Sequence, residues 1–332
     1  MIRTFAFTNA SHLQGRDFAL AQVPGFLADP TVFVWLDLEK PTAEDTRLVL
    51  EQLFHFHPLS IEDCVMVNSS PKVEEYIPRE GDAFAPYLFL VMHAVDYSRA
   101  NEQFATSELN FFLGKKFLVT YHDVPLRSIT TAVERITKGT MPVTRAPDRL
   151  AQTLLDLLVA NYTPALDELA QDVDGLEQLA LRQPTPATLN QILQVKKEVL
   201  HLRQITGPQC AVIARFAAGE FSLIRPHLVP YYRNLHDACQ RINDQAHGYT
   251  DALTGILQVY LNMSSNQTGE VVKVLTLITV ITTPLMMIGT WYGMNFKDMP
   301  EVTWAHGYIY AATAMLVSTG ATYLYFKKRK WF

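Results

Sequence analysis

The chain is poor in cysteine, and its cysteines follow no pattern that predicts a cross-linked or metal-binding scaffold. Its 332 residues include three, Cys64, Cys210 and Cys239, without a CxxC or Cys/His spacing. An odd, scattered set favours free thiols in a reducing compartment over disulfides or a structural zinc site. The start of the chain has no basic segment followed by an apolar run, so we predict no cleaved leader and a cytoplasmic N-terminus.

Motifs of the common enzyme classes are also missing. The sequence contains no GxxxxGK[ST], HExxH or GxSxG pattern, so ATP-driven transport and hydrolysis lack support. We therefore expect no enzyme and no cofactor. His55 and His57 could suggest a metal site, but no matching Cys or acidic pattern accompanies them, which favours surface or packing roles.

Charge is unevenly distributed along the chain, whose formal net charge is −5. Residues 1–270 carry 22 Lys or Arg against 31 Asp or Glu, whereas residues 271–332 carry six against two. An acidic body disfavours nucleic acid as a partner, because binding a phosphate backbone requires clustered Lys and Arg. It is compatible with the attraction of cations.

Two runs near the C-terminus lack charge altogether. Residues 274–296 and 302–326 contain no Asp, Glu, Lys or Arg, and each matches the roughly 20 residues that span a bilayer. A buried hairpin in a soluble core is the alternative. The basic residues 327–330 favour two membrane spans with both termini in the cytoplasm. Only the loop around residues 297–303 would then face outside.

The N-terminal region predicts a mixed domain. Residues 32–37, 86–97 and 109–121 are rich in β-branched and aromatic side chains and are bounded by Gly, Pro and Asp, as strands are. Residues 42–54 begin with a cap-like Thr and continue with helix formers. We predict an α+β cytoplasmic domain with a mixed sheet and flanking helices over residues 1–147.

Helices are predicted for the rest of the chain. Apolar residues at spacings of three and four over residues 154–176 predict one long amphipathic helix, and a second runs over residues 188–218. A seven-residue apolar repeat begins near residue 231 and meets no Pro before Pro284. One helix could therefore continue into the first span, although Gly255 and Gly269 weaken it and a bundle of shorter helices is the alternative. We predict long antiparallel cytoplasmic helices over residues 148–230, followed by a stalk helix over residues 231–292 that becomes the first span at about residue 272. An extracytoplasmic loop is predicted over residues 293–303, the second span over 304–326 and a basic cytoplasmic tail over 327–332.

Two spans cannot enclose an aqueous path alone, so any pore must be oligomeric. The first span offers a candidate lining face at helical spacing, made of Leu275, Thr279, Thr283, Met286 and Thr290. Its hydroxyls could hold water. Threonines that hydrogen-bond to their own backbone in a packed helix are an equally good interpretation.

The segment after the first span carries the most specific motif. Tyr292-Gly293-Met294-Asn295-Phe296 resembles the Tyr-Gly-Met-Asn signature of the CorA family of magnesium transporters, at its place after the first of two terminal spans. The resemblance covers essentially the whole chain. It includes Pro284, the basic tail 327–332, and residues 32–37, 57–63, 72–74 and 117–122.

The resemblance implies a homopentameric channel in the inner membrane, with a funnel-shaped cytoplasmic domain, that admits hydrated Mg²⁺ and also Co²⁺ or Ni²⁺. It assigns the selectivity filter to Gly293, Met294 and Asn295. Mg²⁺ gives up its water reluctantly, so a ring of Asn295 carbonyl oxygens could accept hydrogen bonds from the ion's waters without removing them. The expected partners are further copies of the chain, the lipid bilayer and divalent cations.

The chain departs from the family at the mouth and the gate. Lys297 stands where an acidic residue is common, which leaves Asp298 and Glu301 as the acidic residues of the outer mouth. The family's regulatory aspartates fall on Gln258 and Asn234, and a neutral amide binds Mg²⁺ more weakly than a carboxylate. We therefore expect altered gating by cytosolic Mg²⁺, with three candidate regulatory carboxylates, Asp237, Asp244 and Asp251.

Two other functions stay open at this point. One is a transporter of Zn²⁺ or another divalent ion within the same family, which the intact Gly293-Met294-Asn295 disfavours because zinc-exporting relatives vary this tripeptide. The other is a membrane-anchored, Mg²⁺-sensing scaffold, for which the polar residues of the spans would be incidental.

Overall fold

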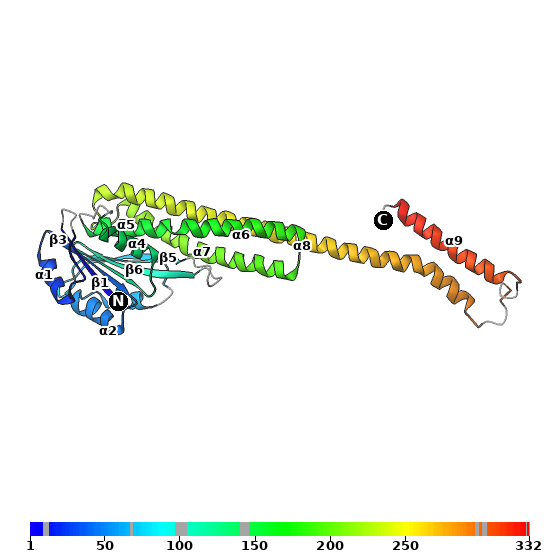
Figure 1. Ribbon diagram of the computed structural model, residues 1–332, viewed down its shortest axis with the longest axis horizontal. Helices are drawn as coiled ribbons and strands as arrows, with labels where there is room; N and C mark the ends of the chain where they lie inside the picture. Colours follow the sequence, from blue (N-terminus) through cyan, green and yellow to red (C-terminus); the bar gives the residue numbers. More distant parts are fainter. Residues whose placement is uncertain are drawn as a thin grey trace. The chain divides into compact units, whose positions relative to one another are not determined.

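The computed structural model describes residues 1–332 except 9–12, 67–68, 97–104, 140–145, 296–298, 301–303, 330 and 332. The chain divides into two compact units (Figure 1). The first unit comprises Met1–Gln178 and Asn190–Ile256, and the second comprises Leu179–Leu189 and Leu257–Phe332.

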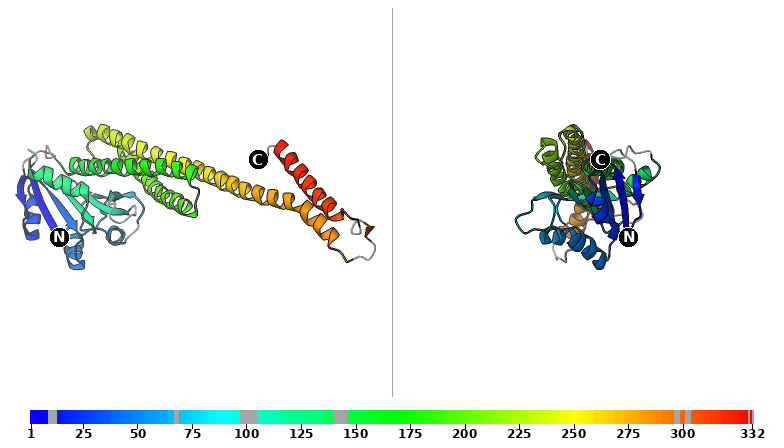
Figure 2. Two further views of the ribbon diagram at one scale, coloured as in Figure 1. Left: turned by 45° about the vertical axis from the view of Figure 1, so that its right-hand side comes forward. Right: turned by 90° about the vertical axis from the view of Figure 1, so that its left-hand side faces the viewer.

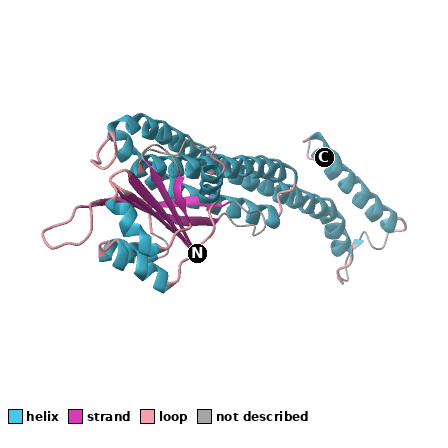
Figure 3. Ribbon diagram, turned by 60° about the vertical axis from the view of Figure 1, so that its left-hand side comes forward, coloured by secondary structure: helices cyan, strands magenta, loops and turns pink. Residues whose placement is uncertain are grey.

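A mixed sheet forms the centre of the first unit (Figure 3). The described residues contribute seven strands in the order β2-β1-β3-β7-β6-β5-β4, in which β3 and β7 are parallel and the other neighbours antiparallel. This confirms the predicted α+β domain with a mixed sheet. The strands are β1 (Ile2–Thr8), β2 (Leu13–Arg16), β3 (Val32–Glu39), β4 (Lys72–Tyr76), β5 (Tyr87–Asp96), β6 (Ala105–Gly114) and β7 (Phe117–His122).

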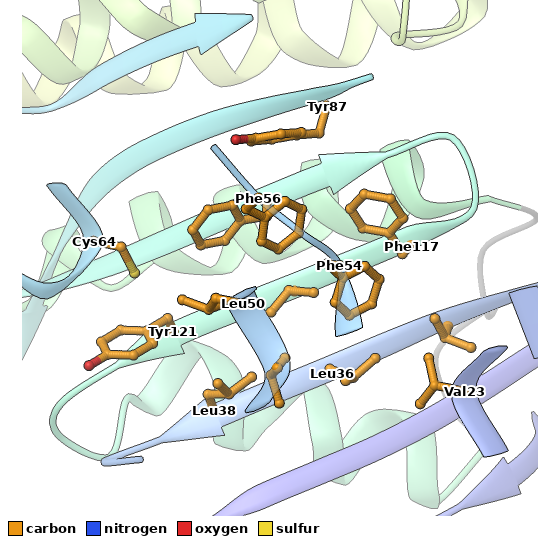
Figure 4. Close-up of a cluster of buried hydrophobic side chains, with 14 of the residues drawn as sticks. Val23, Leu36, Leu38, Leu50, Phe54, Phe56, Cys64, Tyr87, Phe117 and Tyr121 are labelled. Carbon is orange, nitrogen blue, oxygen red and sulfur yellow. The ribbon is translucent and has the colours of Figure 1, made fainter. Parts of the chain in front are cut away.

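Side-chain alternation along the strands gives the sheet two buried faces. One face packs beneath α1 (Val23–Ala28), the π-helical turn η2 (Arg47–Leu53) and α3 (Pro58–Val65), and its core includes Leu36, Phe56 and Phe117 (Figure 4). The other face is covered by α4 (Arg127–Thr137) and α5 (Pro147–Ala160) (Figure 1). Two short segments, η1 (Leu20–Gln22) and α2 (Ala43–Thr46), complete this region.

Local sequence signals explain several boundaries. Thr42 accepts a hydrogen bond from the backbone N–H of Asp45, whose carboxylate accepts one from the N–H of Thr42, so a capping box starts α2 as predicted. His57 caps α3 through its Nδ1, which accepts from the N–H of Leu59 at 3.3 Å. The strand expected over residues 109–121 is instead two strands, because the chain turns between Gly114 and Phe117, where a Cβ on Gly114 would collide with the Phe117 ring.

The single long helix expected over residues 154–176 is also corrected. The chain forms α5 and then α6 (Tyr162–Arg182), with Asn161 between them. Pro164 explains the break, because proline lacks the N–H that would bond to the Ala160 carbonyl and its ring crowds that carbonyl. By contrast, α7 (Pro186–Ala218), which was predicted over residues 188–218, continues without a break through Pro208.

The expected continuous helix is present as α8 (Val229–Tyr292), which follows the short η4 (Pro226–Leu228). It runs without interruption through Gly255, Gly269 and Pro284. In the first unit its repeating apolar residues, among them Leu235, Ile242 and Ile256, are buried. Tertiary packing of this face outweighs the low helix propensity of Gly255.

The cysteine prediction was wrong for two of the three residues. Cys210 on α7 and Cys239 on α8 form a disulfide, with their Cα atoms 5.6 Å apart, while Cys64 is free and buried. The two cysteines come from neighbouring helices and are 29 residues apart in the sequence. No local spacing motif could therefore predict that they pair.

The second unit contains the C-terminal part of α8 and a following helix, α9 (Gly307–Lys328), which turns back along it (Figure 2). Among the described residues, one helix is long and apolar enough to cross a membrane, Pro226–Tyr292, and none of its apolar window is buried. The 22 residues of α9 fall short of that criterion. Eight hydroxyl side chains lower its apolar character, namely Thr313, Ser318, Thr319 and Thr322 and the tyrosines Tyr308, Tyr310, Tyr323 and Tyr325.

Candidate functional site

The predicted filter lies where α8 ends. The helix stops at Tyr292, the N–H of Gly293 still donates to the Gly289 carbonyl at 3.0 Å, and Met294 and Asn295 follow in an exposed turn. Gly293 does not adopt a left-handed conformation. Glycine is favoured there by close approach, because a Cβ would lie 3.1 Å from the Gly289 carbonyl oxygen.

The predicted lining face is exposed along its whole length in the single chain. Leu275 is 64% and Met286 69% exposed, and the threonines of the face are exposed too. The hydroxyl of Thr279 donates to the Leu275 carbonyl at 2.9 Å and that of Thr283 to the Thr279 carbonyl at 2.7 Å. Each hydroxyl has thereby used its only hydrogen, and its oxygen keeps lone pairs that can accept a hydrogen bond.

The three candidate regulatory carboxylates lie on one stripe of α8. Asp237, Asp244 and Asp251 are exposed, and their seven-residue spacing places successive carboxylates about 10 Å apart along the helix. Asp237 lies 3.7 Å from His236, and Asp244 accepts a hydrogen bond from Gln240 at 3.1 Å. The two acidic residues assigned to the outer mouth, Asp298 and Glu301, lie outside the described residues.

Two motif segments that are separate in the sequence meet in the fold. Lys72 at the start of β4 donates to Asp63 of α3 at 2.5 Å and to Glu74 at 3.1 Å. Partial burial disfavours the charged ammonium, but the hydrogen bonds to the two carboxylates outweigh it and raise the pKa of Lys72. This ion cluster fixes α3 against the edge of the sheet.

Sequence reasoning missed a cavity of about 400 Å³ in the first unit. Within the part of the chain that the structure describes, its lining includes the carboxylates of Glu108 and Asp123 and no Lys or Arg. Deeper polar groups are held by the protein itself: His93 Nε2 donates to the Ser69 carbonyl at 2.7 Å, and Asn110 Nδ2 donates to the Cys64 carbonyl at 3.4 Å.

A buried ion cluster was missed as well. Asp37 and Glu39 of β3 converge with His122 of β7, and Arg3 of β1 contacts both carboxylates. Asp37 and His122 end two of the segments that carry the family resemblance, but 85 residues separate them in the sequence. Only the strand order β1-β3-β7 brings them together with Arg3.

Comparison with known proteins connects this fold to a family. A family model described as CorA-like Mg²⁺ transporter protein matches residues 30–328. The cobalt/magnesium transport protein CorA of Thermotoga maritima is 31% identical over 327 residues, which cover 97% of this chain and 91% of that protein. The complete structure of the CorA magnesium transporter from Methanocaldococcus jannaschii aligns with a TM-score of 0.83 at 17% identity, over 99% of this chain and 98% of that one. The full-length CmaX protein aligns with a TM-score of 0.77 at 14% identity, over 99% and 96%.

Fold and sequence together define a membrane metal-ion transporter rather than an enzyme, as predicted. The chain belongs to the CorA-like Mg²⁺ transporter family.

Proposed function

We propose that the chain assembles as a homopentamer whose α8 helices surround a pathway for hydrated Mg²⁺, with Co²⁺ and Ni²⁺ as further permeant ions. The observation that carries this proposal is the course of α8, whose exposed face from Leu275 to Thr290 leads directly to Gly293-Met294-Asn295. A face with hydroxyl groups exposed in the middle of a membrane-length helix requires protein or water against it. Other copies of α8 supply that surrounding.

The chemistry of the lining suits an ion that keeps its waters. The waters around a cation point their hydrogens outward, and the lining must therefore offer acceptors. Thr279 and Thr283 offer them, because their own hydrogens are committed to backbone carbonyls. The side-chain carbonyl of Asn295 continues the series at the filter, and Mg²⁺ is the common divalent cation that sheds water least readily.

The proposed placement in the membrane is multi-pass, with both termini in the cytoplasm of a cell whose inner membrane holds the protein. The helix α9 would be the second span, since 22 residues give about 33 Å of helix. Lys327 and Lys328 in its last turn favour a cytoplasmic end. Entry of a cation is favoured by an inside-negative potential, worth about 2.3 kcal/mol per charge per 100 mV.

Regulation is proposed to differ from that of relatives with stalk aspartates, because Gln258 and Asn234 carry no charge. Asp237, Asp244 and Asp251 are the substitutes on α8. Protection of the full chain from proteolysis by Mg²⁺ should then be weak and should disappear when the three are changed together to Asn. Strong protection that survives this change would contradict the assignment.

Uptake of Mg²⁺ into proteoliposomes that contain the full chain, under an inside-negative potential, tests the function. We expect uptake that Co²⁺ and Ni²⁺ inhibit by competition. Preferential uptake of Zn²⁺ would favour the other divalent-ion function. If the protein binds Mg²⁺ but moves no ion, the scaffold function takes its place.

A further inference from the structure

The register of three strands brings four ionisable side chains together inside the first unit. Arg3 of β1 lies opposite Asp37 of β3, and in the parallel pair β3–β7 Asp37 lies beside Thr120 and Glu39 beside His122. Alternation along each strand directs these residues to the same face, opposite the core of Figure 4. Asp37 and His122 have no exposed side-chain area.

The hydrogen bonds of His122 define its protonation. Its Nδ1 lies 2.6 Å from the carbonyl oxygen of Val124, and its Nε2 lies 3.1 Å from Oδ1 of Asp37. A carbonyl oxygen can only accept, so Nδ1 must donate. The same Oδ1 already accepts from the hydroxyl of Thr120 at 2.6 Å and acts as a carboxylate oxygen, so Nε2 must donate too.

The neighbours of Thr120 indicate the direction of its hydrogen bond to Asp37. The indole N–H of the buried Trp35 donates to the Thr120 hydroxyl at 3.0 Å. Two acceptors lie within reach of the hydroxyl hydrogen, the Leu36 carbonyl at 3.5 Å and Oδ1 of Asp37 at 2.6 Å, and the much shorter distance directs it to Asp37. The series Trp35, Thr120, Asp37 then has one polarity throughout. Nothing in this series offers His122 a hydrogen to accept.

We propose that His122 is a proton-binding site, held as an imidazolium that completes a buried network with Arg3, Asp37 and Glu39. With the proton bound, two cations face two anions and the charges of the network cancel. With the proton lost, a net negative charge is buried and one ring nitrogen opposes an oxygen acceptor at hydrogen-bond distance, which destabilises the fold. The first unit is thereby sensitive to pH.

The same four residues argue against a metal ion at this place. Asp37, Glu39 and His122 offer ligand atoms within 4.8 Å of one another. The guanidinium of Arg3, however, already lies against both carboxylates, 3.4 Å from Oδ2 of Asp37 and in contact with Oε2 of Glu39. Both ring nitrogens are committed to oxygen acceptors, and neither has a lone pair for a metal. A proton, in contrast, needs no displacement of Arg3.

The groups around His122 also favour its protonated form. Burial opposes the charged ring, but the hydrogen bond to Asp37, the charge of Asp37, the Val124 carbonyl and Glu39 together raise the pKa of His122. Among the described residues that line the cavity beside His122, the ionisable ones are Cys64, His93, Glu108, Tyr121, Asp123 and His201, and none of them is Lys or Arg. A raised pKa in the folded state gives stability that is complete below the unfolded value near 6.5 and is lost as the pH rises through the folded value.

Hydrogen–deuterium exchange at the C2 position of each histidine, followed by mass spectrometry of the detergent-solubilised full chain, measures this directly. We expect His122 to titrate above pH 6.5 and to shift to lower pH in Asp37→Asn, while the exposed His55 keeps its profile. Addition of Zn²⁺ or Mg²⁺ should leave the His122 profile unchanged. Titration of His122 at or below pH 6.5 in the wild type would overturn the proposal, and a shift caused by Zn²⁺ would replace the proton with a metal.

A second measurement follows the consequence for stability. Between the unfolded and folded pKa values, the folding equilibrium of the wild type should weaken by up to about tenfold per pH unit, the limit for one released proton. His122→Gln, which remains neutral and can still donate once, should lack this component, whereas His55→Gln should retain it. Parallel pH profiles for wild type and His122→Gln would contradict the proposal.

Discussion

Arg225 holds the buried carboxylate of Asp148 with both sides of its guanidinium. Nε donates to Oδ2 at 2.8 Å and Nη2 to Oδ1 at 2.7 Å, and the backbone N–H of Arg225 adds a third bond to Oδ2 at 3.2 Å. Asp148 lies in the first turn of α5, and Arg225 directly precedes η4 and α8. This pair therefore fixes the start of the longest helix to the helix that covers the sheet.

Removal of Arg225 should destabilise the first unit. In Arg225→Met the carboxylate of Asp148, which is 5% exposed, loses its cation. We expect a loss of about 2–3 kcal/mol in the free energy of unfolding, less than for a fully buried pair because Arg225 is partly exposed. Lys138→Met, which breaks an exposed pair with Glu134, should cost under about 0.5 kcal/mol. Denaturant titration of both variants checks this, and equal losses would contradict it.

The disulfide between Cys210 and Cys239 should make stability depend on reductant. A cross-link at a separation of 29 residues restricts the unfolded chain, for which the expected gain is about 3 kcal/mol. Dithiothreitol should therefore lower the unfolding temperature of the wild type and leave that of the Cys210→Ser, Cys239→Ser double variant unchanged.

Alkylation in denaturant, without reductant, counts the free thiols in the same protein. We expect a single modified cysteine, Cys64, in the wild type. Three modified cysteines would show that the α7–α8 cross-link does not form.

Two adjacent threonines of α8 offer a matched test of the lining face. Thr282 and Thr283 are both exposed and both donate to their own helix, but they are about 100° apart around it. Thr283→Val should lower Mg²⁺ flux by about two- to tenfold, the factor that corresponds to one lost hydrogen bond. Thr282→Val should keep the wild-type flux. The opposite order would assign the pathway to another face of the helix.

How far the sequence predicted the structure depends on the range of the interaction concerned. The heptad residues of α8, such as Leu235 and Ile242, share one helix face, so their spacing alone predicted a continuous helix and its buried side. The capping box at Thr42 is equally local. The break between α5 and α6 could also have been predicted locally, from Pro164. It was missed because the apolar repeat continues across the break.

Contacts between distant segments could not be predicted in the same way. The pair Cys210–Cys239 and the network around His122 depend on which helices and strands become neighbours. The strand β3 pairs with β7 although three strands and three helical segments lie between them in sequence. The candidate filter, in contrast, was found from a local motif and not from a contact between distant segments. Asn295 was found by this motif, and it lies exposed directly after α8.

The role of Asn295 in the proposed filter is tested most directly by a comparison of Mg²⁺ uptake into proteoliposomes with wild type, Asn295→Ala and Asn190→Ala. Asn190 is an exposed asparagine on α7 and serves as the matched control. We expect that Asn295→Ala, which removes the acceptor for the waters of the ion, alters or abolishes selective uptake, while Asn190→Ala transports like the wild type. Wild-type rate and ion preference in Asn295→Ala would contradict it.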